Sequence, residues 1–233
     1  MTQQAQYSGA RILEAMHEAV RYTEAIYEII KRTKPPHGQA ILEFGAGDGA
    51  FIGKFADEGI YVHAVEKDAK LRAELQNRNV RFVREDIRLV ESESFDFVYT
   101  VNVLEHIEDL EAELREIHRV LRRDGTIFVF VPAFEMLWTS LDDEVGHVRR
   151  FTKLSLCDAL QKAGFTVARV EYFDCLGFPA ALLVRLLETL GMFRYQPESV
   201  RFYDRYIFPI SRSLDRILHQ VFGKNLVAVA RKP

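Results

Sequence analysis

One glycine-rich segment limits what this chain can fold into more than any other feature. Residues 45–49 read Gly-Ala-Gly-Asp-Gly and separate a short apolar run, 40–44, from a helical pattern that begins at residue 50. Glycine adopts positive φ at low cost and lets a backbone approach a ligand closely. A helix that begins behind such a turn also offers free N–H groups. The segment therefore predicts a strand–turn–helix unit with a ligand at the turn, although an ordinary tight turn fits the same pattern.

Apolar strand patterns and helical patterns alternate along the rest of the chain. This alternation predicts an α/β fold with a parallel sheet that helices cover on both faces. We expect Asp68 and Thr152 to be the N-caps of the helices that follow them, and Asp124-Gly125 to stop the helix predicted over 110–121. Predicted strands cover residues 40–44, 60–65, 80–83, 95–101, 126–131, 165–173 and 225–230, and predicted helices cover residues 9–33, 50–56, 68–77, 110–121 and 152–163.

Length and composition narrow the class of protein. The 233 residues suit one domain, and a net charge of -3 does not indicate a nucleic-acid partner. The two cysteines form no CxxC pair, so we expect neither a zinc site nor disulfides, and we assign no metal ligand. The polar N-terminus resembles no signal peptide, and the longest apolar stretch, 176–187, is interrupted by Arg185. We therefore expect a cytoplasmic protein without a transmembrane segment.

Acidic residues end two of the predicted strands. Glu66 follows the second strand, where a carboxylate can accept both hydroxyls of a ribose. Asp86 follows the third strand, where its carboxylate and the next backbone N–H can bind an adenine edge. The carboxyl ends of the strands are where open α/β sheets bind ligands. With the glycine turn, these acids predict a nucleoside-containing ligand, whereas either acid alone could be a solvated strand end.

In order and spacing, these motifs resemble those of the class I S-adenosylmethionine-dependent methyltransferases. Residues 41–49 resemble the first motif of that family, 65–68 the ribose motif, 85–87 the adenine motif, and 95–106 the motif near the methionine. Residues 120–126 resemble the turn before the fifth strand, with Asp124 where proline is more usual. The expected cofactor-binding residues are Glu43, Phe44, Gly45, Ala46, Gly47, Asp48, Gly49, Glu66, Lys67, Asp86, Ile87, Asn102, Val103 and Leu104.

The resemblance covers about residues 40–173 and implies the domain plan. We expect a Rossmann-like, doubly wound, seven-stranded, mostly parallel sheet with an antiparallel last strand. A single methyltransferase domain, 1–233, would comprise a helical cap (1–36), a cofactor-binding core (37–174), a helical insertion (175–223) and the last strand (224–233). The insertion could pack on the sheet, cover the acceptor, form a homodimer, or contact a membrane through 176–222.

Three side chains are candidates for catalysis. His106 and Glu105 follow the fourth strand, and His147 follows the fifth, so they can border one cleft. Imidazole titrates near neutral pH, so His106 is the first candidate for a base that removes the acceptor's proton. Equally, Glu105 and His106 could hold the loop or cap the next helix.

Three further side chains are candidates for binding the acceptor. Arg149 and Arg150 could hold a carboxylate or phosphate. They could instead form a salt-bridge cluster with the acids at 142–144. Tyr22, on the first helix, could reach the acceptor or the cofactor's methionine.

Three functions fit these observations. The first is methyl transfer from S-adenosylmethionine, leaving S-adenosylhomocysteine, to oxygen or nitrogen of a small molecule. Residues 141–142, 146–151 and 223–233 resemble a bacterial subgroup linked to cell-surface polysaccharide or lipid-linked sugar pathways, so the acceptor could be sugar- or lipid-linked. The second is a non-catalytic S-adenosylmethionine-binding or assembly protein. The third, a nicotinamide-dependent reductase, fits less well because Ala50 stands where G-x-G-x-x-G needs glycine.

Overall fold

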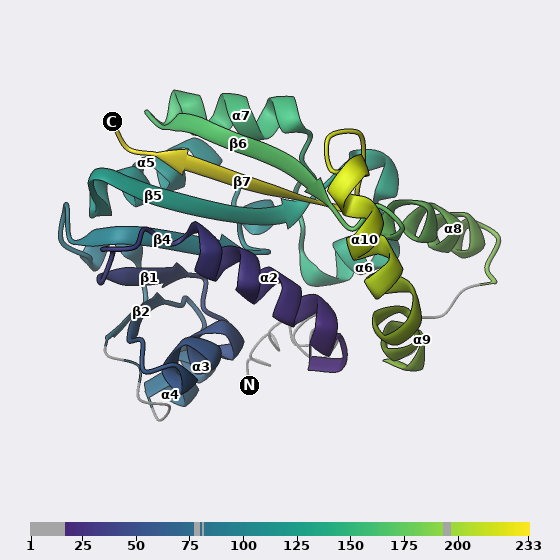
Figure 1. Ribbon diagram of the computed structural model, residues 1–233, viewed down its shortest axis with the longest axis horizontal. Coiled ribbons are helices and arrows are strands. Elements are labelled where there is room, and N and C mark those ends of the chain that lie inside the picture. Colours follow the sequence, from purple (N-terminus) through teal and green to yellow (C-terminus); the bar gives the residue numbers. More distant parts are fainter. Residues whose placement is uncertain (1–16, 77–79, 81, 193–196) are drawn as a thin grey trace, which may run out of the picture.

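The computed structural model describes residues 17–76, 80, 82–192 and 197–233. Its centre is a seven-stranded sheet in the order β3-β2-β1-β4-β5-β7-β6 (Figure 1). β7 runs antiparallel to β5 and β6, and the remaining pairs are parallel. The expected sheet with an antiparallel last strand is therefore confirmed. The strands are β1 (Ile41–Phe44), β2 (Val62–Val65), β3 (Val83–Arg84), β4 (Phe95–Val101), β5 (Leu121–Pro132), β6 (Thr166–Phe173) and β7 (Asn225–Arg231).

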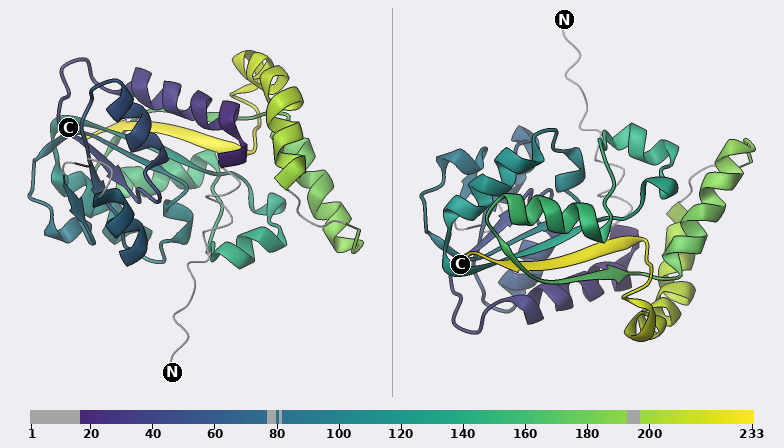
Figure 2. Two further views of the ribbon diagram at one scale, coloured as in Figure 1. Left: turned by 90° about the horizontal axis from the view of Figure 1, so that it is seen from below. Right: turned by 90° about the horizontal axis from the view of Figure 1, so that it is seen from above.

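Helices cover both faces of the sheet, as Figures 1 and 2 show. On one face, Ile26 and Ile30 of α2 and Phe55 of α3 join the apolar cluster beneath the strands. On the other face, Leu114 of α5 and Leu160 of α7 do the same. The apolar positions of each helix thus fall on the side that meets the sheet. The helices that flank the sheet on its two faces are α2 (Val20–Thr33), α3 (Ala50–Asp57), α4 (Ala69–Gln76), α5 (Leu110–Val120) and α7 (Lys153–Lys162).

Capping and helix-stop residues in the sequence predicted most helix ends correctly, but not all of them. Thr152 caps α7 and Asp68 accepts from backbone N–H groups at the start of α4, as expected. The helix expected over 110–121 is α5, which ends one residue earlier, at Val120, because Leu121 already pairs with β4. Asp124-Gly125 does not stop this helix but lies within β5, where Asp124 has φ 61° and the pairing with β4 shifts register. The expected first helix begins at residue 9, and its part before residue 17 lies outside the described residues.

The insertion before β7 extends beyond the sheet at the end where the parallel strands finish (Figures 1 and 2). It comprises α8 (Gly177–Thr189), followed by α9 (Pro197–Phe202), a π-helical turn η4 (Tyr203–Ile207) and α10 (Phe208–Leu218). Asp204 accepts hydrogen bonds from the backbone N–H groups of Arg21 and Tyr22, at 3.0 and 2.8 Å. The carboxylate of Asp204 therefore joins the start of α2 to the insertion.

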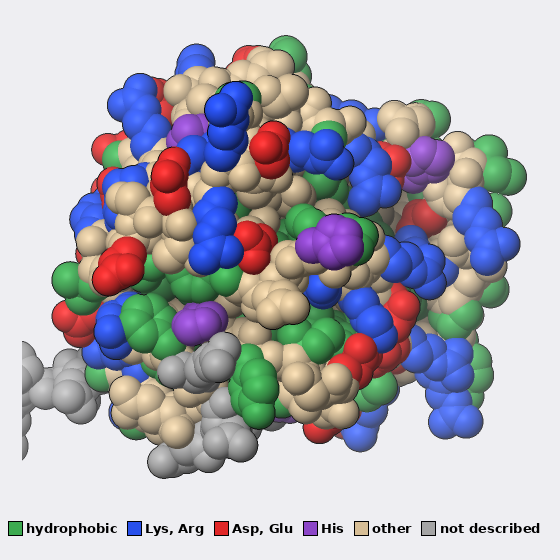
Figure 3. Space-filling model, turned by 60° about the vertical axis from the view of Figure 1, so that its left-hand side comes forward, with side chains coloured by type: hydrophobic (Ala, Val, Ile, Leu, Met, Phe, Trp, Pro, Cys, Tyr) green, Lys and Arg blue, Asp and Glu red, His purple; other side chains and the backbone are tan. Residues whose placement is uncertain are grey.

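The charge of the surface and the length of the helices indicate which kinds of partner the protein suits. The face drawn in Figure 3 carries lysine and arginine side chains interspersed with aspartate and glutamate, rather than a field of one sign. Among the described residues, no helix is long and apolar enough to cross a membrane.

The strand order determines where a ligand can bind. β1 lies between β2 and β4, so the chain leaves β1 toward one side of the sheet and later returns on the other. At such a switch point the connections diverge and leave a crevice at the carboxyl ends of the strands. The glycine turn after β1 and the segment after β4 both border this crevice.

Candidate active site

The glycine turn adopts the backbone conformation for which glycine was expected. Gly45, Gly47 and Gly49 have φ of 76°, 55° and 78°. The N–H groups of Gly45 and Ala46 both donate to the carbonyl of Val65, at 2.8 and 3.1 Å. The turn is thus fixed to the end of β2.

Val103, just after β4, packs directly on the turn. A Cβ placed on Gly45 would lie 2.3 Å from Cγ2 of Val103. Val103 belongs to the same short segment as Asn102 and the 3-10 helix η2 (Leu104–His106). This contact brings η2, which carries two catalytic candidates, beside the predicted cofactor turn.

Glu66 is well placed for the predicted ribose contact. Its Oε2 accepts from the N–H of Gly47 and its Oε1 from the N–H of Asp68, both at 2.8 Å. Burial raises the pKa of Glu66, and these N–H donors oppose the rise. A carboxylate has about four acceptor positions, so each oxygen can still accept a hydroxyl.

The predicted adenine residues lie at the end of β3. Asp86 Oδ1 accepts from the backbone N–H of Arg88 at 2.8 Å and from its Nη1 at 3.1 Å. The pKa of Asp86 is lowered, chiefly by that backbone N–H. The side chain of Ile87 is fully buried, so only its backbone could meet an adenine. Lys67 is exposed, and its carbonyl accepts from Arg72.

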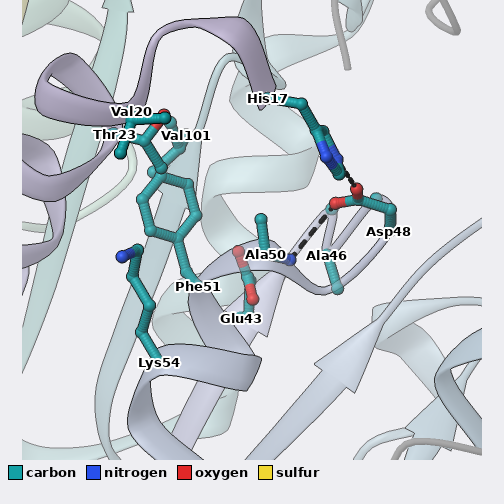
Figure 4. A pocket seen from close by; sticks show the side chains of 12 residues that line it. His17, Val20, Thr23, Glu43, Ala46, Asp48, Ala50, Phe51, Lys54 and Val101 are labelled. Carbon is teal, nitrogen blue, oxygen red and sulfur yellow. Dashed lines mark hydrogen bonds and ion pairs between the residues drawn. The ribbon is translucent and has the colours of Figure 1, made fainter. Parts of the chain in front are cut away.

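A cavity of about 220 Å³ lies between α2 and the glycine turn (Figure 4). Its walls include Glu43, the turn residues 45–48, and Phe51. Glu43 accepts a hydrogen bond from Tyr99 at 2.9 Å, and burial raises the pKa of its carboxyl well above the usual range. Phe44 is buried in the core on the other side of β1.

Sequence reasoning missed that His17 belongs to this cavity. His17 forms an ion pair with Asp48, and Asp48 also accepts from the backbone N–H of Ala50 (Figure 4). Nothing in the local pattern around residue 17 could have indicated this, because the contact depends on how α2 lies across the sheet.

The three catalytic candidates lie close together, on the side of the glycine turn where η2 packs; we refer to this as the acceptor side. The rings of His106 and His147 lie 4.6 Å apart between centroids, edge to face. Glu105 Oε1 lies 3.8 Å from His147 Nε2. Burial raises the pKa of Glu105 to about 8, and burial followed by the nearby His147 lowers the pKa of His106.

Asp142 organises this cluster, a role that sequence reasoning did not assign to it. Asp142 accepts from Nε and Nη2 of Arg150, each at 2.8 Å, and its Oδ1 lies 2.7 Å from His147 Nδ1. Burial acts to raise the pKa of Asp142, but His147 and Arg150 outweigh burial and hold it well below the usual range. Asp142 also completes the capping box of α6 (Ser140–Val145) with Thr139, which is the one local signal for its position.

The structure confirms the expected salt bridge for Arg150 but shows none for Arg149. The guanidinium of Arg150 pairs with Asp142, whereas Arg149 donates from Nη2 to the carbonyl of Glu108 at 2.8 Å. The buried Nε of Arg149 has no hydrogen-bond partner among the described residues. Tyr22 has a packing role: its hydroxyl donates to Asn225 at 2.7 Å, and its ring packs edge-on against Phe173. Acceptor binding by Arg149, Arg150 and Tyr22 stays a prediction.

The chain's own groups fit an S-adenosylmethionine site. The three glycines at positive φ let a ligand approach the backbone of the turn closely, Glu66 retains acceptor positions for a diol, and Asp86 with the backbone of Ile87 suits an adenine edge. Each group follows one of three neighbouring strands, and each resembles the matching family motif.

Comparisons with known proteins identify the family. A family profile described as "Methyltransferase domain" matches residues 16–170. Malonyl-[acyl-carrier protein] O-methyltransferase of Halorhodospira halophila is 26% identical over 77% of this chain and 67% of its own length. Phosphoethanolamine N-methyltransferase 2 of Caenorhabditis elegans is 30% identical over 44% of this chain and 26% of its own. The chain spans 26 to 56% of the first curated relatives it matches.

Solved structures agree on the fold. A methyltransferase structure from Thermotoga maritima has a TM-score of 0.64 and 18% identity, and the match covers 96% of this chain and 95% of that one. At that identity the likeness shows the fold alone. With the profile match, it establishes that this chain belongs to the class I S-adenosylmethionine-dependent methyltransferases, whose cofactor is S-adenosylmethionine.

Proposed function

We propose that this domain transfers the methyl group of S-adenosylmethionine to an oxygen or nitrogen atom of a small acceptor. The observation that carries the proposal is the cluster of Glu105, His106 and His147 beside the glycine turn, with Val103 packed on Gly45. Proton-accepting groups next to a methyl donor suit acceptors that must lose a proton. The names of two relatives, an O- and an N-methyltransferase, are consistent with both kinds of acceptor.

Each part of the site has a separate task. The glycine turn and Glu66 hold the cofactor, which supplies an electrophilic methyl group when bound. The cluster positions the acceptor and draws off its proton. The methyl carbon forms its new bond as the carbon–sulfur bond breaks, and the electron pair of that bond stays on sulfur. Holding the two partners in line accounts for most of the acceleration, as in other reactions of bound pairs.

Cofactor binding and turnover are tested separately. Calorimetric titration with S-adenosylhomocysteine should show binding, and Glu66→Ala should weaken it by roughly 10- to 100-fold, since a charge-assisted pair of hydrogen bonds is lost. Glu91→Ala, at an exposed acid outside the predicted cofactor motifs, is the matched control. An unchanged affinity in Glu66→Ala would make the ribose assignment wrong.

Release of S-adenosylhomocysteine is the measurement for turnover. It should appear with hydroxyl- or amine-bearing acceptors. Binding without any such release would favour the non-catalytic alternative. Binding of NAD(H) in place of S-adenosylhomocysteine would revive the reductase alternative, which the family match does not support.

A lipid-linked acceptor is the more specific candidate, and an exposed stripe on the insertion favours it. Six apolar side chains spaced three or four residues apart are 36 to 78% exposed along α9, η4, α10 and the turn after α10. Arg205 and Arg216, both exposed, lie beside this stripe. An apolar helix face flanked by arginines suits an anionic lipid surface. The stripe comprises Phe202, Tyr206, Ile210, Leu214, Ile217 and Val221.

Vesicle sedimentation tests this candidate. The protein should bind vesicles of phosphatidylcholine mixed with phosphatidylglycerol more strongly than vesicles of phosphatidylcholine alone. Ile217→Glu should abolish the difference, and Leu154→Glu, at an exposed leucine on α7, should not. Concentration-dependent dimers without vesicle binding would assign the stripe to a second copy and contradict the lipid assignment.

A further inference from the structure

The cluster of Glu105, His106 and His147 contains a buried carboxylate to which no other described residue donates a hydrogen bond. The side chain of Glu105 is 1% exposed, and neither oxygen has a hydrogen-bond partner in another described residue. A buried carboxylate without a partner is costly, and proteins avoid the cost by protonating it, pairing it or binding a cation. In the part of the chain that the structure describes, His147 Nε2 is also buried without a hydrogen-bond partner, and it lies 3.8 Å from Glu105 Oε1.

The orientation of His147 leaves a lone pair directed toward Glu105. Its Nδ1 lies 2.7 Å from Oδ1 of Asp142, and a carboxylate held by Arg150 can only accept, so Nδ1 carries the proton. Nε2 is then the basic nitrogen. A histidine whose far nitrogen is held by a carboxylate is the usual arrangement around a protein-bound metal ion, because the carboxylate fixes the ring and raises its basicity.

His106 completes a set of three potential ligands. One ligand atom from each of Glu105, His106 and His147 lies within 4.8 Å of the other two. Ligand atoms on a tetrahedral zinc ion lie about 3.2–3.6 Å apart, as follows from metal–ligand distances of about 2.0–2.2 Å. A small movement of the His106 ring would bring the three ligand atoms from this separation to the spacing that zinc requires. Because the ring is only half-buried, the cluster also has a route to solvent. Two imidazoles and one carboxylate form the donor set of catalytic zinc and of other divalent transition metals.

We propose that Glu105, His106 and His147 bind a divalent transition-metal ion, with Zn²⁺ and Mn²⁺ as the ions to test. The expectation from the sequence was that the chain has no metal ligand, because it relied on cysteine spacing. Three protein ligands leave at least one coordination position open on the acceptor side of the turn. On the proposed function, on which this role rests, that position takes an acceptor oxygen, so the preferred acceptors carry a hydroxyl or a vicinal diol. With their lone pairs on the metal ion, the three side chains no longer accept the acceptor's proton themselves; the ion makes the hydroxyl more acidic, and its proton passes to water.

Metal binding can be measured without any methyl acceptor. Tag-free protein stripped with EDTA should bind one Zn²⁺ or Mn²⁺ per chain in a calorimetric titration, and Co²⁺ should give a visible absorption band. Glu105→Gln should weaken the affinity by roughly 100-fold or more, at least as much as the loss of an outer-shell partner. His37→Asn, at an exposed histidine away from the cluster, should leave the affinity unchanged.

The S-adenosylhomocysteine affinity of each variant separates the two proposals. Retained cofactor binding with lost metal binding supports the metal site and shows that the variant is folded. If Glu105→Gln does not fold, His106→Gln, at a half-buried ring, serves the same purpose. Failure of the stripped wild-type protein to bind either ion would overturn the metal site and leave the methyltransferase proposal standing. So would variants that bind either ion as tightly as the wild type. Metal binding without cofactor binding would contradict the methyltransferase proposal alone.

Discussion

The two sides of the crevice are built in different ways. On the cofactor side, residues 43–49 and 66–68 are short contiguous motifs held by backbone hydrogen bonds, such as those from Gly45 and Ala46 to Val65. On the acceptor side, Glu105 meets His147 across about forty residues of sequence, and His147 in turn meets Asp142. Beside one backbone hydrogen bond, from Val148 to Glu105, these connections are made by side chains. The difference teaches that one side can be identified from local sequence, whereas the other exists only once the chain is folded.

The largest effect is expected where the acceptor side loses its organising acid. Asp142→Asn leaves Arg150 and His147 without their buried partner, and breaking a buried ion pair costs about 3–5 kcal/mol. Urea denaturation should show this loss in the free energy of unfolding. Asp143→Asn, at the exposed neighbour that accepts from Trp138, should cost less than about 1 kcal/mol.

The same variants show how separate the two sides are. The affinity of folded Asp142→Asn for S-adenosylhomocysteine should stay close to that of the wild type, because no side chain of the predicted cofactor set contacts Asp142 in the described network. A large loss of cofactor affinity would contradict the proposed division between the sides.

A smaller effect is expected at the contact where the two sides meet. Gly45→Ala puts a side chain at φ 76° and within 2.3 Å of Val103. Left-handed backbone costs about 1–2 kcal/mol and overpacking about 1–3 kcal/mol. Thermal unfolding and S-adenosylhomocysteine titration should both show the loss. Gly53→Ala, in a helix with open space around it, should be neutral or stabilising by up to about 1 kcal/mol.

A double variant sharpens this result. Adding Val103→Ala to Gly45→Ala removes the clash but not the backbone strain, so stability and cofactor affinity should return in part. Purely additive losses in the double-mutant cycle would show that the contact does not couple the two sides.

The smallest effect is a pH dependence on the cofactor side. Burial raises the pKa of Glu43, although its hydrogen bond from Tyr99 opposes the rise. The folded protein therefore binds this proton more tightly than the unfolded chain does. The resulting stabilisation is complete below the unfolded pKa and is lost as pH rises through the folded one.

Glu43→Gln removes this dependence while keeping an acceptor for Tyr99. Measured by thermal unfolding, the stability of the variant relative to the wild type should rise with pH above the usual glutamate range. Each 1 kcal/mol corresponds to about 2–4 °C in a protein of this size. Glu74→Gln, at an exposed glutamate, should show no such trend. A constant difference across pH would show that Glu43 is not the source.

Most of the fold could be predicted, and the failures occur where contacts between separate segments decide the outcome. The apolar periods of β1, β2, β4 and α7 are set by neighbours in sequence, so their positions were predicted closely. β3 was expected over 80–83 but lies at Val83–Arg84, because its short length is determined by pairing with β2. The arginine at 150 looked equally suited to an acceptor or an ion pair, since only the folded chain brings Asp142 to it.

By itself, the sequence determined the sheet, the strand-end acids and the glycine turn, because backbone conformation and strand period depend on adjacent residues. Tertiary structure alone decided that Val103 packs on Gly45, that Asp142 orients His147, and that the buried carboxylate of Glu105 has no hydrogen-bond partner in another described residue. These contacts join segments far apart in sequence, and their geometry follows from how strands β1, β4 and β5 align in one sheet.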